Sequence, residues 1–124
     1  MAPTPDSFRA PLCRVDLLTD AHTTRVLVSG EIDLSSADAV QERIRSALET
    51  SETGQLVVDL RGLTFMDSTG LRLLVWLTDV AREYRHLLSI VRPPPPASRT
   101  IEIAGLDAVL PLIDDPTDLS IAES

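Results

Sequence analysis

The sequence predicts an α/β fold in which helices pack on one mixed β-sheet. Short segments rich in Val, Leu and Ile alternate along the chain with longer segments whose apolar residues recur every three or four positions. The first two strand-like segments follow each other directly, as in an antiparallel hairpin. The later ones are separated by helical segments, which implies crossovers and parallel neighbours. The expected order of elements is therefore ββαβαβαβ.

The size of the chain predicts a single domain. Its 124 residues have room for one compact core. Apolar residues make up 44% of the chain and aromatic residues only 3%, so Leu, Val and Ile must build that core. We expect a flexible tail over residues 1–11, the domain over 12–113, and an acidic tail over 114–124 with room for a short helix from Pro116.

The first half of the domain is predicted to begin with the hairpin. Residues 13–17 alternate apolar and polar side chains, and residues 25–29 form the antiparallel partner strand. A loop over 30–34 leads to a helix whose first turn is capped by Ser35 or Ser36. Apolar residues gather on one face of this helix and charged residues on the other: Ala37, Val40, Ile44, Ala47 and Leu48 against Asp38, Glu42, Arg45 and Glu49.

The second half begins with a segment that is nearly all apolar. Residues 56–60 are typical of a central strand covered on both faces. A loop over 61–67 follows, and then a helix from about Ser68 to Tyr84. The side chains expected in the core of this region are Leu56, Val58 and Leu60 in the strand and Leu74 and Val75 in the helix.

The remaining elements are shorter. Residues 87–91 form a strand that ends before four consecutive prolines at 93–96, where we expect a stiff loop rather than a polyproline docking site. A helix over 97–104 follows, with Gly105 suited to end it. Residues 110–113 form the last strand.

Charge and composition argue against several classes of function. The chain has 19 acidic and 11 basic residues, a net charge of −8, so we expect no nucleic-acid partner and no membrane partner. The chain has no apolar stretch of transmembrane length, and its first residues lack the apolar core of a signal peptide, so we expect a cytoplasmic protein. The single cysteine, Cys13, is expected to be a buried apolar side chain. Because no Cys or His cluster has metal-site spacing, we expect no metal and no cofactor.

The candidate functional segment is Asp67-Ser68-Thr69-Gly70, between a buried strand and a helix. Such residues have a structural explanation, because short polar side chains accept hydrogen bonds from the free N–H groups of a first helical turn. Enzyme explanations fit poorly. A nucleophile elbow needs Gly where Met66 stands, and an aspartic-protease loop has one residue fewer between its Asp and Gly. A phosphate-binding loop needs a Lys, which the chain lacks, so we expect no enzyme.

Three segments carry a resemblance to a known family. The run from Val57 to Leu71, Val-Val-Asp-Leu-Arg-Gly-Leu-Thr-Phe-Met-Asp-Ser-Thr-Gly-Leu, resembles the signature of STAS domains, which are named for sulphate transporters and anti-sigma factor antagonists. Residues 29–33, Ser-Gly-Glu-Ile-Asp, are similar to a loop of the same family. Residues 103–107, Ile-Ala-Gly-Leu-Asp, resemble its last helix and the Gly-Leu that ends it. The resemblance covers roughly residues 12–113.

The resemblance implies an anti-sigma factor antagonist, or anti-anti-sigma factor, that works by partner switching. The unmodified protein binds an anti-sigma factor with serine kinase activity and so releases a sigma factor. Phosphorylation of one serine inactivates it, and a phosphatase reverses the step. Ser68 matches this phosphoacceptor, with Ser35, Ser36 and Thr69 as secondary candidates. The partner-binding residues that the resemblance implies are Asp33, Asp67, Ser68, Thr69, Gly70 and Leu71.

An alternative that the resemblance leaves open is a STAS scaffold or regulatory component of a larger signalling complex that does not act on a sigma factor.

The energetics of the implied phosphorylation can be compared. A phosphate on Ser68 adds about −1.5 to −2 charge. We expect the dipole and free N–H groups of the helix start to favour it by roughly 0.3–1 kcal/mol, with Asp67 opposing. Burying that charge without cations in an interface costs several kcal/mol, so the switch is expected to act at the interface.

Overall fold

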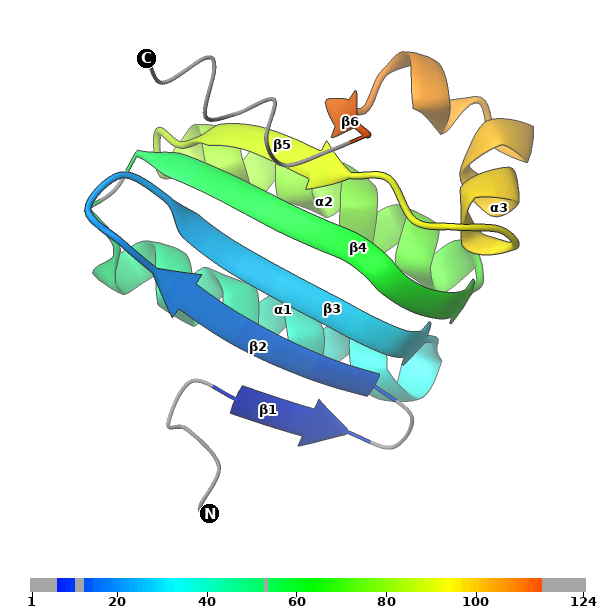
Figure 1. Cartoon of the computed structure of the whole chain (residues 1–124), viewed down its shortest axis with the longest axis horizontal. Helices are drawn as coiled ribbons and strands as arrows, with labels where there is room; N and C mark the ends of the chain where they lie inside the picture. The colour runs from blue at the N-terminus through cyan, green and yellow to red at the C-terminus, as the bar shows by residue number, and fades with distance from the viewer. Residues whose placement is uncertain (1–6, 11–12, 53, 115–124) are drawn as a thin grey trace.

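The computed structural model describes residues 7–10, 13–52 and 54–114 of the chain. Within these ranges six strands form one sheet in the order β1-β2-β3-β4-β5-β6 (Figure 1). Strands β1, β2 and β3 pair antiparallel, whereas β3, β4, β5 and β6 are parallel, which confirms the predicted mixed α/β fold. The elements are β1 (Ser7–Ala10), β2 (Cys13–Thr19), β3 (Thr24–Ile32), α1 (Leu34–Thr50), β4 (Gln55–Met66), α2 (Ser68–Glu83), β5 (Leu87–Val91), α3 (Ala97–Ile103), a 3-10 turn η1 (Leu106–Ala108) and β6 (Leu112–Ile113).

Strand β1 corrects the expectation of an N-terminal tail over residues 1–11. Its four residues pair antiparallel with β2, from Ser7 opposite Asp16 to Ala10 opposite Cys13. Four residues are too few to show a period, and the edge of β2 supplies the pairing that holds them. The other residues of the expected tail, and residues 115–124 with the short helix expected from Pro116, lie outside the described residues.

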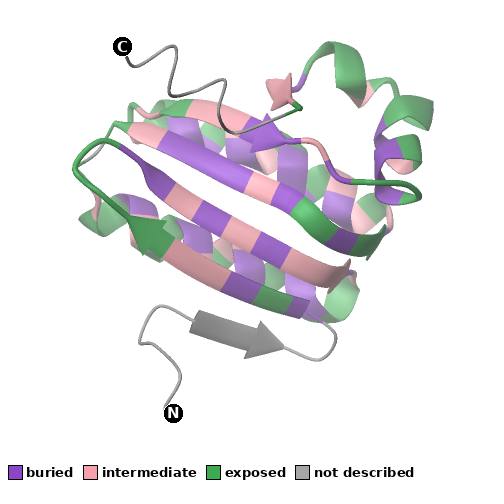
Figure 2. Cartoon of the chain, viewed as in Figure 1, coloured by how far each residue is buried: buried purple, intermediate pink, exposed green. Residues whose placement is uncertain are grey.

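Helices α1 and α2 both cover the same face of the sheet, behind it in Figure 1. Strand β4 sends Leu56, Val58 and Leu60 to this face, where all three are buried, as predicted. The central strand was expected to be covered on both faces, but α1 and α2 cover only one of them. Strand alternation directs the neighbouring residues of β4 to the opposite face, which α1 and α2 leave open. Val57 on that face is nevertheless buried, in a small cluster with Val91. Figure 2 shows the alternation of buried and less buried positions along β3, whereas residues 56–58 of β4 are all buried.

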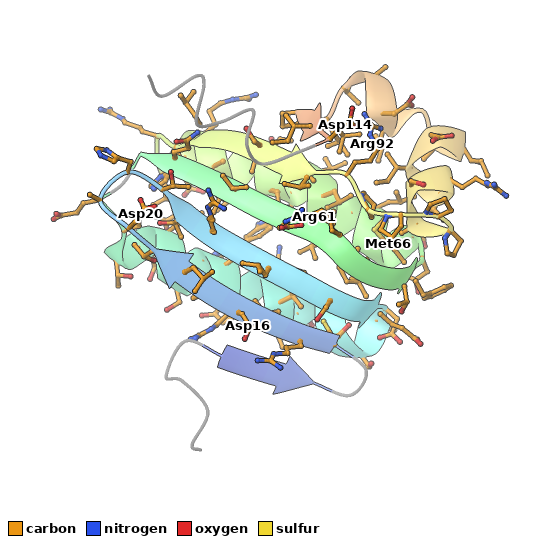
Figure 3. All side chains as sticks on the ribbon, viewed as in Figure 1. Asp16, Asp20, Arg61, Met66, Arg92 and Asp114 are labelled. Carbon is orange, nitrogen blue, oxygen red and sulfur yellow. The ribbon has the colours of Figure 1, made fainter. Side chains whose placement is uncertain are left out.

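The uncovered face of the sheet carries ion pairs (Figure 3). Arg61 contacts Asp59 through its Nη2, 2.7 Å from Oδ2, and both residues lie on β4. On β2, Nε of Arg14 lies 2.9 Å from Oδ2 of Asp16. Charged side chains thus occupy the surface that the helices leave open.

Strands β3 and β4 continue beyond their predicted ends. Loops were expected over residues 30–34 and 61–67, but the two strands stay paired as far as Ile32 and Met66. The pairing tolerates glycine because the strands approach closely: a Cβ on Gly62 would lie 2.7 Å from the Cβ of Ser29. Backbone hydrogen bonding across the pair therefore outweighs the low strand propensity of the glycines.

Helix α2 has the bounds that the sequence predicts and buries a continuous apolar stripe against the sheet. Leu74 is fully buried, as expected, but Val75 is 43% exposed, so the prediction that it packs on the sheet is wrong. Position 75 lies about 100° further around the helix than Leu74, on the side away from Leu73 and Leu77, so Val75 falls outside the inward stripe. The inward stripe consists of Leu73, Leu74, Leu77, Val80 and Ala81.

The last elements close one end of the core. Ala97 and Ile101 of α3 are buried in it, and Gly105 ends the helical segment with a left-handed φ of 75°, as the sequence predicts. Cys13 is buried as expected, and burial raises the pKa of its thiol. In the described part of the chain no helix is both long enough and apolar enough to cross a bilayer.

Gly70 and Met66 hold the corner between β4 and α2. Both residues are buried, and a Cβ on Gly70 would overlap Cγ of Met66 and lie 2.8 Å from its Sδ. Met66 is labelled in Figure 3 at the end of β4. This contact leaves no room for any larger residue at position 70.

Two adjacent substitutions in α2 should differ sharply in effect. Leu74→Ala removes a fully buried side chain and should lower the free energy of unfolding by about 2–5 kcal/mol. Val75→Ala, on the exposed side, should change it by less than about 0.5 kcal/mol. Chemical denaturation of both variants measures the difference, and equal losses would contradict the orientation of the helix.

Gly70→Ala tests the corner. Helix propensity alone predicts a gain of up to about 1 kcal/mol, because Gly70 is helical and Ala is the better helix former. The overlap with buried Met66 predicts a net loss of about 1–3 kcal/mol instead. Chemical denaturation decides the sign. In a double-mutant cycle with Met66→Ala the two losses should be less than additive, because the shorter side chain makes room; strict additivity would argue against the contact.

Candidate functional site

The site is built where β3 and β4 end side by side. Ile32 is the register partner of Met66, so the next residues, Asp33 and Asp67, occupy equivalent positions. The backbone N–H of Asp67 donates to the carbonyl oxygen of Ile32 at 3.4 Å, which ties the two corners together. Helices α1 and α2 each begin one residue later. Both helix N-termini therefore lie at the same end of the molecule, at the arrowheads of β3 and β4 in Figure 1.

Asp67 caps helix α2. Its Oδ1 accepts hydrogen bonds from the backbone N–H groups of Thr69, at 2.9 Å, and Gly70, at 3.3 Å. Its backbone is extended, as at most N-caps. The structural explanation for a polar residue at this helix start thus holds for Asp67. It also removes two of the N–H groups that the sequence analysis expected to be free for an anion.

Asp33 caps helix α1, which corrects the prediction of a serine cap. Its Oδ1 accepts from the N–H of Ser35 at 2.9 Å, while Oγ of Ser36 accepts from the N–H of Asp33 at 3.1 Å. The helix starts before Ser35 because β3 runs to Ile32, so the cap falls on the aspartate and Ser36 completes a capping box. The hydroxyl of Ser35, which donates to Oδ1 at 2.6 Å, is the main cause that lowers the pKa of Asp33.

Ser68 is the first residue of α2, and it is exposed. Among the described residues none forms a hydrogen bond with its hydroxyl. The secondary candidates differ from it: Ser35 is bonded to Asp33, Ser36 is buried, and Thr69 is half-buried. Of the four, Ser68 is therefore the one that is exposed and whose hydroxyl forms no hydrogen bond with the described residues.

The other residues implied by the resemblance divide into two groups. Asp33 and Asp67 are half-buried caps and Thr69 lies beside a groove, so all three reach the surface near Ser68. Gly70 is buried under Met66, and Leu71 packs partly against the core. Gly70 and Leu71 thus contribute to the packing beneath the site rather than to its surface.

A groove of about 280 Å³ lies between the first turns of α1 and α2. Leu34, 79% exposed, stands on its α1 side, and Arg72 stands on its α2 side. Sequence reasoning missed both residues, although an apolar residue between Asp33 and Ser35 is an available signal. Arg72 follows Ser68 by four positions, so the two residues share one side of the helix. In the residues that the structure describes, no group of three His, Cys, Asp or Glu side chains is placed to hold a metal ion.

Comparisons with known proteins agree with this geometry. A family model described as "Mlab, STAS domain" matches residues 15–114. An anti-sigma F factor antagonist from Paenibacillus polymyxa is 27% identical over 90 residues, which are 73% of this chain and 77% of that protein. The crystal structure of an anti-sigma factor antagonist from Mycobacterium paratuberculosis has a TM-score of 0.77 at 28% identity and covers 98% of this chain and 97% of its own.

A third likeness is one of fold. The Bacillus cell fate determinant SpoIIAA in its phosphorylated form has a TM-score of 0.64 at 18% identity, covering 88% of this chain and 97% of that one. The family model spans most of the chain, including both capped corners and the run from Val57 to Leu71. The chain belongs to the STAS domain family.

Proposed function

We propose that this protein is an anti-sigma factor antagonist. It binds an anti-sigma factor with serine kinase activity and thereby releases a sigma factor in the cytoplasm. Phosphorylation of Ser68 ends the binding, and a phosphatase restores it. The protein is a binding module and catalyses no reaction itself. The observation that carries the proposal is the exposed hydroxyl of Ser68 at the start of α2, which forms no hydrogen bond with the described residues, in a chain whose relatives include anti-sigma factor antagonists.

Accessibility supports Ser68 as the phosphoacceptor. A kinase must bring the hydroxyl oxygen to its own bound nucleotide, so the side chain has to leave the surface of this domain without breaking bonds. Modifying Ser36 would open the capping box of α1, and modifying Ser35 would break its bond with Asp33. Ser68 has neither obstacle, because Asp67 supplies the cap of α2.

The groove beside Ser68 supports this end of the molecule as the partner surface. Leu34 is a large apolar side chain, 79% exposed on the wall of this groove, so a partner that occupied the groove would bury it. Arg72 and Asp38 line the same groove with opposite charges. Of the six partner-binding residues implied by the resemblance, Thr69 lines this groove, and Asp33 and Ser68 are the chain neighbours of its lining residues Leu34 and Thr69. We extend the proposed set by Leu34 and Arg72.

The charges near Ser68 indicate how the switch works. A phosphate there is repelled by Asp67, which already holds the N–H groups of Thr69 and Gly70. Arg72, four residues along the helix, attracts it by about 0.3–0.5 kcal/mol, the size of an exposed pair. These small opposing terms leave the domain folded. Burial of the same charge against a partner costs several kcal/mol, so the loss of partner affinity dominates.

The structurally similar Bacillus protein SpoIIAA supports the same conclusion, because its fold accommodates a phosphate group. We propose that the switch in this chain needs no second conformation. Phosphorylation changes the surface that the partner meets.

Removing the hydroxyl tests the site of modification. Ser68→Ala should take up no stoichiometric phosphate from the cognate anti-sigma factor kinase and ATP, as measured by mass spectrometry of the intact protein. Ser35→Ala serves as the control and should be phosphorylated like the wild type. Stoichiometric phosphate on Ser68→Ala would assign the site to another residue.

Adding a charge tests the mechanism. Ser68→Asp should bind the partner more weakly than wild type in calorimetric titration, while its melting temperature stays close to that of the wild type. Ser68→Ala should bind normally and cost less than about 0.5 kcal/mol of stability, because Asp67 supplies the cap.

The control is Ser46→Asp, which adds the same charge at an exposed position of α1 outside the groove. It should leave partner affinity unchanged. Equal weakening by both aspartates would show that net charge acts rather than a local clash. A large drop in melting temperature for Ser68→Asp would show instead that the charge acts by unsettling the domain.

A further inference from the structure

A second concave site lies at the other end of α2. A cavity of about 510 Å³ is lined by the last turns of α2, the start of β5, and residues between η1 and β6. The sixteen residues of α2 span about 24 Å at 1.5 Å per residue, so this cavity is well separated from Ser68. Its volume falls within the range typical of sites for small molecules.

Two arginines, Arg82 and Arg85, line the cavity. Arg82 and Arg85 are both exposed, and within the described ranges neither guanidinium has a hydrogen bond or an ion pair. Arg14, Arg61 and Arg92 each contact a carboxylate. Arg82 and Arg85 are neighbours on the cavity wall, and no acidic side chain of the described residues forms an ion pair with either of them. The helix dipole favours cations at this end of α2, but it does not account for their place at a cavity wall.

The backbone at Arg85 is a second, independent observation. Its φ is 58°, in the left-handed region where helix ends favour glycine. The N–H of Arg85 donates to the carbonyl oxygen of Arg82, and that of His86 donates to the carbonyl oxygen of Ala81 at 2.8 Å. The chain thus carries a long cationic side chain at a position where the backbone favours no side chain at all. Such an unfavourable choice is typical of functional positions.

Apolar side chains complete the walls. Leu87 is 76% exposed and Val109 is 70% exposed, although both are large and apolar. Leu88 and Ala81 lie deeper and are half-buried and buried. Cations at one side of an apolar hollow suit a ligand with an anionic head and an apolar body.

We propose that this cavity binds a small amphipathic anion, either a carboxylate or a phosphate ester with a short hydrocarbon chain. The anionic head pairs with the guanidinium groups of Arg82 and Arg85, which are suited to bidentate contacts with either group. The hydrocarbon chain covers Leu87 and Val109. This inference does not rest on the proposed partner switch, because none of the residues of the Ser68 end lines the cavity.

The test titrates the full ¹⁵N-labelled chain with hexanoate, hexyl phosphate and neutral 1-hexanol. Both anions should give saturable amide shifts at residues 82–88 and 106–110 and none at Ser68, with 1-hexanol much weaker. The tighter of the two anions identifies the head group. Arg85→Gly should weaken anion binding roughly tenfold or more, the loss expected for one charge-assisted hydrogen bond. Its melting temperature should hold or rise, because glycine suits the left-handed backbone.

Arg99→Gln is the matched control, since Arg99 is exposed on α3 and does not line the cavity. It should leave anion affinity unchanged. The proposal is overturned by an absence of saturable shifts at millimolar anion, by equal binding of 1-hexanol, or by an Arg85→Gly variant that binds like wild type. If Arg99→Gln weakened anion binding as much as Arg85→Gly does, the loss would reflect net charge alone, and the proposal would be overturned as well.

Discussion

The parallel pairing of β3 with β4 up to Ile32 and Met66 is the constraint on which the rest of the structure depends. Because the two strands end at the same level, the residues that follow them start two helices side by side. The N–H of Asp67 bonded to the carbonyl oxygen of Ile32 keeps the two starts in step. The groove between the helices and the position of Ser68 beside it both follow from that alignment. A shift of one residue in the pairing would turn Met66 out of the core and separate the two corners.

Asp33 and Asp67 cap helices α1 and α2, so the cap of α2 falls on the residue before Ser68. A carboxylate accepts several hydrogen bonds at once, so Asp67 satisfies two N–H groups of α2 and Asp33 accepts from both the backbone and the hydroxyl of Ser35. If Ser68 were itself the cap, any modification of its oxygen would unsettle the helix. With the cap on the preceding residue, the hydroxyl of Ser68 takes no part in the capping hydrogen bonds of α2.

Much of the fold was predictable from the sequence because its signals are local. The hairpin of β2 and β3, the bounds of α2, strand β5 and the turn at Gly105 all follow from periodicity or from backbone preference. The predictions that failed concern features that tertiary contacts determine. Strands β3 and β4 continue past their glycines because they pair with each other. Strand β1 forms because the edge of β2 is available for pairing. Val75 is exposed because of the way α2 is rotated about its axis. Ser68 is a candidate from a resemblance in sequence, and its role stays a prediction. Leu34 had a local signal, an apolar residue between Asp33 and Ser35, that the sequence analysis did not use. Arg72 had none, because the groove joins residues from two helices that no local pattern connects.

The uncovered face of the sheet has a consequence for self-association. A flat sheet without helices would ordinarily stack on that of another molecule, as in a sandwich fold. Here the face carries Arg61 with Asp59 and Arg14 with Asp16, paired on the same strands and in contact with water. Stacking would strip water from both pairs, and their mutual attraction would not fully offset the desolvation cost. The ion pairs thus disfavour the stacking of two such sheet faces.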